Sequence, residues 1–167
     1  VNNPPSSRWY SGSGIYRDVD LTITDDVHVD LNGTKVTTPN LETEKGSTVN
    51  TNVTATVAND SDAAKSVAVR HTVFPKDGSA DQSIGTVTTN AQSIAAGATA
   101  EIQATVPVSN PELWSVENPS LYTVRTEVLV DGQVTDTYDT EYGFRYFNFD
   151  SNTGFSLNGE NMKLKGV

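Results

Sequence analysis

The residues best suited to chemistry in this sequence are Arg8, Trp9 and Tyr10, which lie together close to its start. An aromatic ring can stack on the apolar face of a pyranose, and an arginine can donate hydrogen bonds to sugar hydroxyls. The competing interpretation is that Trp9 and Tyr10 only pack one domain against its neighbour. The sequence therefore offers a candidate sugar-contact cluster, for which interdomain packing stays open as the alternative.

Other residues give weaker signals for a metal or catalytic site. The two histidines, His28 and His71, are far apart and have no ligand-like neighbours, so we expect both to be ordinary strand residues. Two pairs of acidic residues suggest calcium at first sight; they are Asp18 with Asp20 and Asp25 with Asp26. Neither pair lies in a loop with the alternating acidic ligands and glycine of an EF-hand, which favours a solvated face. We expect no metal and no cofactor.

The overall composition argues against several classes of partner. The net charge is −10, whereas nucleic acids and anionic membranes attract clustered lysine and arginine. The chain has no cysteine, which excludes disulfides and thiolate metal sites. No apolar run is long enough to span a membrane. Residues 1–7 lack the basic and apolar regions of a signal peptide, and we expect them to be a cut inside a longer protein.

The elements that must position these residues are β-strands. Apolar and polar residues alternate in several segments that are separated by turn residues, which is typical of strands with one buried face. The expected strands are Ile15–Thr24, Val27–Leu31, Val49–Val57, Val67–Val73, residues 82–89, Ile102–Val108, Tyr122–Val130 and residues 134–144. Asn32-Gly33 and Asp131-Gly132 predict hairpin turns. About seven strands between 25 and 146 predict an all-β antiparallel sandwich, immunoglobulin-like or fibronectin-III-like, without a disulfide.

A proline-bracketed segment, Pro111–Tyr122, breaks the strand pattern and is expected to cross one end of the sandwich. Each proline removes a backbone donor and biases the preceding residue toward extended geometry. The residues expected in the structural core around it are Trp114, Leu121, Tyr122 and Phe144. Tyr146 and Phe147 are expected at the sandwich edge or between domains. Arg145 either pairs with a carboxylate across a domain junction or is a solvated charge at a strand end.

Three stretches together resemble the family 2 glycoside hydrolases, which include β-galactosidases, β-glucuronidases and β-mannosidases. Residues 8–19 (Arg-Trp-Tyr-Ser-Gly-Ser-Gly-Ile-Tyr-Arg-Asp-Val) resemble the end of that family's sugar-binding jelly roll. Residues 111–122 resemble the Leu-Trp…Asn-Pro…Leu-Tyr segment of its immunoglobulin-like domain. Residues 142–167, from Tyr-Gly-Phe-Arg to Lys-Gly-Val, resemble the junction into its catalytic TIM barrel.

The resemblance implies a division into three parts. Residues 1–24 would be the last strand of a truncated jelly roll, 25–146 the sandwich, and 147–167 a linker and separate small hairpin leading into an absent barrel. The jelly roll and the barrel of the same parent chain are the expected partners. Carbohydrate would be bound only through the parent, and neither nucleic acid nor membrane insertion is expected.

The family's catalytic residues lie in the barrel, so no catalytic residue is assigned to this sequence. The parent is expected to be a retaining hydrolase of terminal β-galactosides, which uses two carboxyls about 5–5.5 Å apart. The sandwich itself is expected to be a non-catalytic spacer, with an independent carbohydrate-binding or adhesin-type module as the alternative. We expect the surface or exterior of a bacterium as the location, with the cytoplasm left open.

Overall fold

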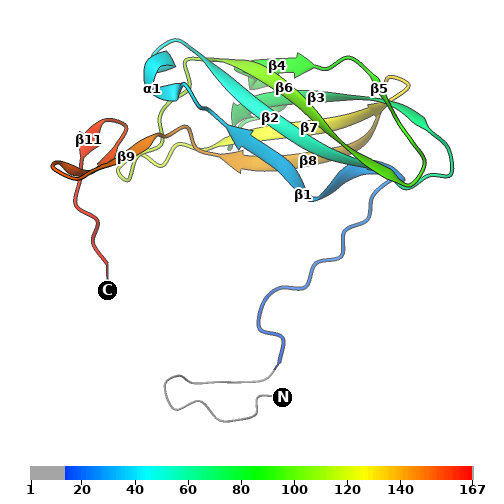
Figure 1. Cartoon of the computed structure of the whole chain (residues 1–167), viewed down its shortest axis with the longest axis horizontal. Coiled ribbons are helices and arrows are strands. Elements are labelled where there is room, and N and C mark those ends of the chain that lie inside the picture. The colour runs from blue at the N-terminus through cyan, green and yellow to red at the C-terminus, as the bar shows by residue number, and fades with distance from the viewer. Residues whose placement is uncertain (1–13, 167) are drawn as a thin grey trace.

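The computed structural model describes residues 14–166, which contain two antiparallel β-sheets that pack face to face (Figure 1). The first sheet has the order β1 (Val27–Thr37), β2 (Thr48–Asn59) and β6 (Ala98–Ser109). The second has the order β4 (Gly85–Thr88), β3 (Lys65–Pro75), β7 (Tyr122–Val130) and β8 (Gln133–Tyr142), and β5 (Gln92–Ile94) also pairs with β3. The predicted all-β antiparallel sandwich is confirmed.

Three smaller elements complete the described part of the chain. A short helix α1 (Leu41–Glu44) follows β1, and a 3₁₀ turn (Ala80–Gln82) precedes β4. A separate three-stranded sheet follows the sandwich, in the order β11 (Glu160–Asn161), β10 (Gly154–Leu157) and β9 (Phe147–Asp150). None of the helices in the described part of the chain is long and apolar enough to cross a membrane.

The core between the two sheets follows from the alternation of apolar side chains along the strands. In β2 every second residue from Val49 to Asn59 is buried, so one face of the strand is turned inward. The buried apolar residues form two clusters. One contains Val27, Val29, Ala55, Val57, Val67, Val69, Ile94, Ile102 and Val128. The other contains Leu41, Val49, Val53, Val73, Val106, Val108, Tyr122, Val124 and Phe144. Leu41 in α1 closes the second cluster.

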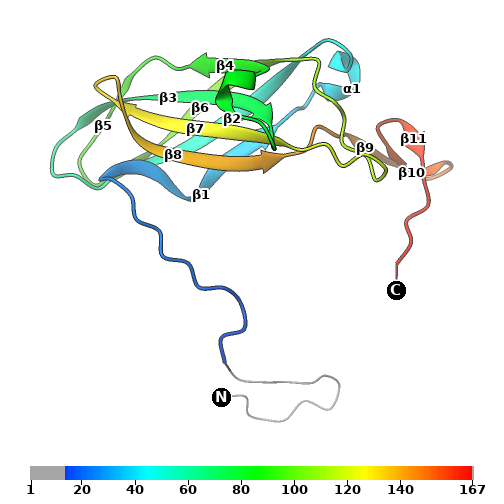
Figure 2. The same cartoon turned by 180° about the vertical axis from the view of Figure 1, so that it is seen from behind.

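Side-chain hydrogen bonds close the gap between the edge strands β1 and β8. The bonds are Thr135 Oγ1 to Val27 O (3.0 Å), Val29 N to Asp136 Oδ2 (2.9 Å), Thr34 Oγ1 with Thr140 Oγ1 (2.7 Å) and Thr38 Oγ1 with Tyr142 Oη (2.8 Å). The residue numbers of the bonded partners increase along both strands, so β1 and β8 run in the same direction. The chain therefore enters the sandwich at Val27 and leaves it at Tyr142, at the opposite end (Figures 1 and 2).

The predicted hairpin turn at Asn32-Gly33 is wrong, because β1 continues through it as a bulge. Val29 pairs with Val57 and Thr34 with Ala55, so four residues of β1 oppose a single residue of β2. Asn32 has a φ of 56°, and a Cβ on Gly33 would lie only 2.7 Å from the Asp30 carbonyl oxygen. Turn-forming residues serve here to bend a strand. The Asp131-Gly132 turn, in contrast, joins β7 to β8 as predicted.

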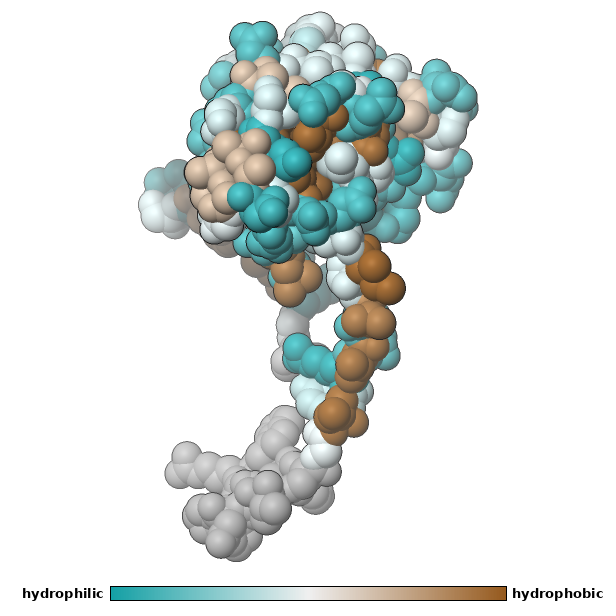
Figure 3. Space-filling model, turned by 90° about the vertical axis from the view of Figure 1, so that its right-hand side faces the viewer, coloured by the Kyte–Doolittle hydropathy of each residue, from teal (hydrophilic) through white to brown (hydrophobic). Residues whose placement is uncertain are grey.

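The segment Ile15–Thr24, predicted to be a strand of a jelly roll, pairs with no other described part of the chain. These residues have no strand assignment, since no described segment pairs with their backbone. Their alternating apolar side chains are turned to solvent, with Ile15 84% exposed and Leu21 86% exposed. Figure 3 shows these hydrophobic residues as a brown stripe that leads up to the sandwich.

Candidate functional site at the end of the sandwich

The Pro111–Tyr122 segment is a rigid crossing at the end of the sandwich where β8 finishes. Its backbone is held by Trp114 N, which donates to Phe144 O at 2.8 Å. The Glu112 amide donates to Tyr122 Oη at 2.8 Å, and the Glu112 carboxylate accepts from Asn118 Nδ2 at 2.7 Å. Hydrogen bonds within the segment therefore replace the secondary structure that its prolines exclude.

Trp114 lies outside both core clusters, which differs from its predicted place in the core. Its side chain is half-buried and lies across Gly143, where an added Cβ would come within 3.2 Å of the indole. The Arg145 guanidinium lies over the Trp114 ring, 4.6 Å from its centroid. Trp114 therefore contacts both a glycine backbone and an arginine, and the position of the arginine over the ring favours cation–π attraction.

Phe144 and Tyr122 occupy the core position at this end of the sandwich. Phe144 is completely buried and Tyr122 is 8% exposed, whereas Leu121 is half-buried. The Phe144 ring meets those of Tyr122 and Tyr142 edge to face, with 5.1 Å between the centroids in both pairs. This arrangement suits the quadrupoles of the rings and fixes the direction in which the chain leaves β8.

Asn158 fastens the small β9–β11 sheet to the sandwich. Its side-chain Nδ2 donates to Trp114 O at 2.9 Å, and its Oδ1 accepts from Tyr146 N at 3.2 Å. Its own backbone amide donates to Tyr146 O at 2.9 Å. Asn158 has a φ of 53°, a conformation that asparagine tolerates better than most residues. Asn158-Gly159 has the composition of a turn, but a turn motif gives no information about a side chain that bonds across 44 residues.

Lys45 makes a second connection between the sandwich and the small sheet. Its Nζ donates to Tyr146 Oη and lies 4.9 Å from the centroid of the same ring. This hydrogen bond raises the pKa of the Lys45 ammonium above its usual value. Lys45 directly follows α1, so the short helix positions this contact. The hairpin expected to be separate is therefore attached at two points.

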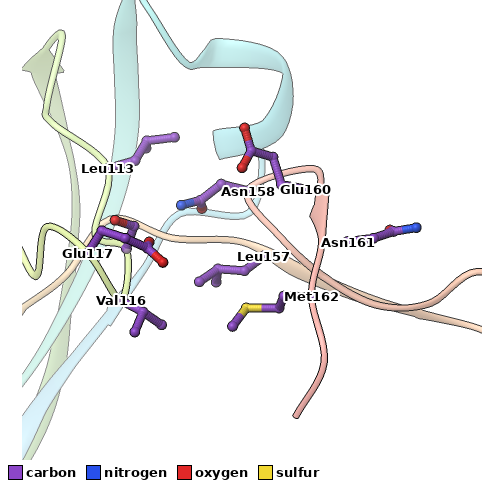
Figure 4. A pocket seen from close by; sticks show the side chains of 9 residues that line it. Leu113, Val116, Glu117, Leu157, Asn158, Glu160, Asn161 and Met162 are labelled. Atoms are coloured by element: carbon purple, nitrogen blue, oxygen red, sulfur yellow. The ribbon is translucent and has the colours of Figure 1, made fainter.

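A polar groove of about 530 Å³ lies between the crossing segment and the small sheet (Figure 4). Leu113, Val116 and Glu117 form one wall, and Leu157, Asn158 and Met162 lie across from them. Within residues 14–166, no group of three or more histidine, aspartate or glutamate side chains is placed to hold a metal ion. The groove supplies hydrogen-bonding groups without a recognisable reactive centre.

The other candidate residues are not brought to this end. Arg8, Trp9 and Tyr10 lie outside the described residues. His28 lies near the start of β1, with Nδ1 2.9 Å from Asp25 O. His71 is buried between the sheets, with Nδ1 3.0 Å from Thr126 Oγ1, and desolvation lowers its pKa from 6.5 to about 4. Neither histidine has a carboxylate partner among the described residues, and neither lines the groove beside Asn158.

Comparison with known proteins gives a consistent family match. The family model described as Glycosyl hydrolases family 2 matches residues 27–145. The chain is 36% identical to Beta-galactosidase BoGH2A of Bacteroides ovatus over 98% of its own length and 18% of that protein. It is 33% identical to a putative beta-glucuronidase of Formosa agariphila, over 98% of the chain and 14% of that protein. A solved family 2 member from Bacteroides cellulosilyticus superimposes with a TM-score of 0.84 at 33% identity, over 95% of this chain and 21% of that one.

Proposed function

The chain belongs to family 2 of the glycosyl hydrolases, and we propose that it is the rigid spacer of a longer β-galactosidase. Its immunoglobulin-like sandwich is a non-catalytic domain of such a glycosidase. The chain spans less than a quarter of the length of the relatives it matches. In the proposal, a sugar-binding jelly roll precedes Val27 and a catalytic barrel follows the small β9–β11 sheet.

The observation that carries the spacer proposal is the path of the chain through the sandwich. Entry at Val27 and exit at Tyr142 are separated by the paired length of β1, which matches Asn59 to Asn52 of β2 and is about 23 Å at about 3.3 Å per residue. Side-chain bonds close the β1–β8 edge, and Ser109 N donates to Ile84 O at 2.8 Å on the opposite side. A body closed on both sides holds the flanking domains at a fixed distance.

A fixed distance matters because catalysis depends on accurate placement of reacting groups. A displacement of about 1 Å can reduce a rate about a hundredfold. The test replaces residues 27–142 of the long enzyme with a flexible Gly/Ser linker. We expect kcat/KM to fall at least about a hundredfold, and the matched sandwich of the Bacteroides cellulosilyticus relative to restore it. Unchanged activity with the flexible linker would overturn the spacer role.

The choice of β-galactoside as the substrate rests on the name of the relative with 36% identity. A putative beta-glucuronidase at 33% identity supports the other substrate, a β-glucuronide. Turnover of chromogenic β-galactoside and β-glucuronide by the long enzyme separates the two. We expect hydrolysis of the galactoside, and hydrolysis of the glucuronide alone would contradict it. The present chain by itself should turn over neither.

The polar groove beside Asn158 gives some support to a second function, that of an independent carbohydrate-binding module. Its Asn and Glu side chains could donate and accept hydrogen bonds with sugar hydroxyls. An NMR titration of the chain with galactose and lactose distinguishes this function from the spacer. Saturable shifts of groove amides at millimolar sugar would support binding, whereas the spacer proposal predicts none.

A further inference from the structure

One face of the small β9–β11 sheet is apolar and uncovered. Phe147 and Phe149 alternate along β9, and they pair with Leu157 and Phe155 of β10 respectively. Since alternate residues of a strand point to the same side, all four side chains share one face. Phe147 is 63% exposed and Phe149 is 66% exposed. The three phenylalanine rings lie 5.0 to 6.4 Å apart, as one aromatic cluster.

The apolar surface continues beyond this sheet onto the end of the sandwich. A groove of about 440 Å³ joins the three rings to Trp114 and Val116 on the crossing segment, and to Met162 and Leu164 after β11. We call this surface the aromatic face. Contiguous apolar surfaces of this kind on soluble domains mark sites of interaction.

Among the described residues that line the aromatic face, Arg145 is the one cation. Arg145 is exposed and lies over the Trp114 ring. The described residues form three ion pairs, Arg70–Glu127, Lys76–Glu141 and Arg125–Asp139, and Arg145 belongs to none of them. In a chain with a net charge of −10, this arginine is an unusual feature for an apolar surface, and it fits a partner with a carboxylate at its rim.

We infer that the aromatic face is the docking surface for the catalytic domain of the same polypeptide. That domain presents apolar side chains to the rings and a carboxylate to Arg145. The inference rests on the proposed function and adds to it the surface by which the spacer holds the barrel. Met162 and Leu164 themselves line the groove, so a domain attached beyond them is held next to the face at high effective concentration. The relatives have ample chain for such a domain, since this chain accounts for 18% and 14% of two of them.

The test is thiol labelling of a single cysteine on the aromatic face. The chain contains no cysteine, so Phe149→Cys gives a clean probe, and the long enzyme carries the same substitution with its other cysteines replaced by serine. Leu31→Cys is the matched control, because Leu31 is 74% exposed on the β1 bulge away from this face. We expect Phe149→Cys to react at least about tenfold more slowly in the long enzyme than in the present chain, and Leu31→Cys to react equally in both.

The role of Arg145 is tested in the same assay. Adding Arg145→Met to the long enzyme should raise the labelling rate of Phe149→Cys about fivefold, while Lys35→Met, a control on β1, should leave it unchanged. Equal labelling of Phe149→Cys in the long enzyme and the present chain overturns the inference. The inference is also overturned if Phe149→Cys reacts slowly in the present chain and its labelling rate depends on protein concentration. That result would show that a second copy of the chain covers the aromatic face.

These outcomes can be separated from failure of the proposed function. If the long enzyme hydrolyses β-galactosides but leaves Phe149→Cys reactive, the spacer holds its barrel through another surface. If Phe149→Cys is protected but the flexible linker leaves activity unchanged, the aromatic face is the docking surface and the spacer proposal is wrong.

Discussion

His71 makes the stability of the sandwich depend on pH. Its side chain is fully buried between the sheets, and only Nδ1 has a partner, the Thr126 hydroxyl at 3.0 Å. Desolvation penalises the charged imidazolium and lowers the pKa of His71 from 6.5 to about 4. The folded chain therefore holds this histidine neutral at a pH where the unfolded chain would protonate it.

The sign and size of the effect follow from proton linkage. Below pH 6.5 the unfolded state binds more protons than the folded state, so the free energy of unfolding falls as pH falls. The contribution of His71 is constant above about pH 6.5. It decreases by about 2 kcal/mol at pH 5 and by about 3 kcal/mol at pH 4, and little is lost below that.

Urea unfolding of the present chain at several pH values between 7.5 and 4 measures this effect. The variant His71→Leu removes the titrating group, so its free energy of unfolding should fall about 2 kcal/mol less than that of the natural sequence between pH 7.5 and pH 5. His28→Gln is the matched control for the removal of a histidine from a strand. Identical pH dependence of His71→Leu and the natural sequence would refute the reasoning, as would an NMR titration of His71 with a midpoint near 6.5.

Three further predictions concern residues that stabilise a turn, a bulge and the attachment of the small sheet. Asn59→Ala removes a buried amide whose Nδ2 donates to the Ala63 and Ile94 carbonyls, and urea unfolding should show a loss of about 2–3 kcal/mol. Gly33→Ala forces the β1 bulge to shift, because the new Cβ would lie 2.7 Å from the Asp30 carbonyl oxygen. We expect the free energy of unfolding to fall by about 1–3 kcal/mol, and an unchanged urea midpoint would contradict this contact. Asn158→Ala should increase amide exchange in β9–β11 and leave that of the sandwich unchanged, while Asn158→Gly, which keeps the positive φ without strain, separates the loss of the side chain from the backbone effect.

Most of the strands could be predicted from the sequence because their pattern is local. Along β2, β6 and β7, side chains alternate between core and solvent, and this period of two can be read without knowing the neighbours. The Asp131-Gly132 turn depends equally on local geometry, with positive φ at both residues. Membership of the glycoside hydrolase family was predicted from three motifs, and the family match over residues 27–145 confirms it. The choice between a galactoside and a glucuronide as substrate stays a proposal.

The tertiary structure decided the features that depend on what lies opposite a residue. Asn32-Gly33 has the composition of a turn, but continued pairing of β1 with β2 makes it a bulge. The bracketing prolines of Pro111–Tyr122 identify a crossing segment, yet the Trp114 ring lies half-buried against Gly143 and the core position is taken by Phe144.

The sequence by itself predicted an all-β sandwich and its resemblance to a glycoside hydrolase family, because both depend on local patterns of residues. Only the tertiary structure revealed the aromatic face and the connections made by Asn158 and Lys45. Those features join residues that are far apart in the sequence, and such contacts are set by packing between elements, which no local pattern of residues encodes.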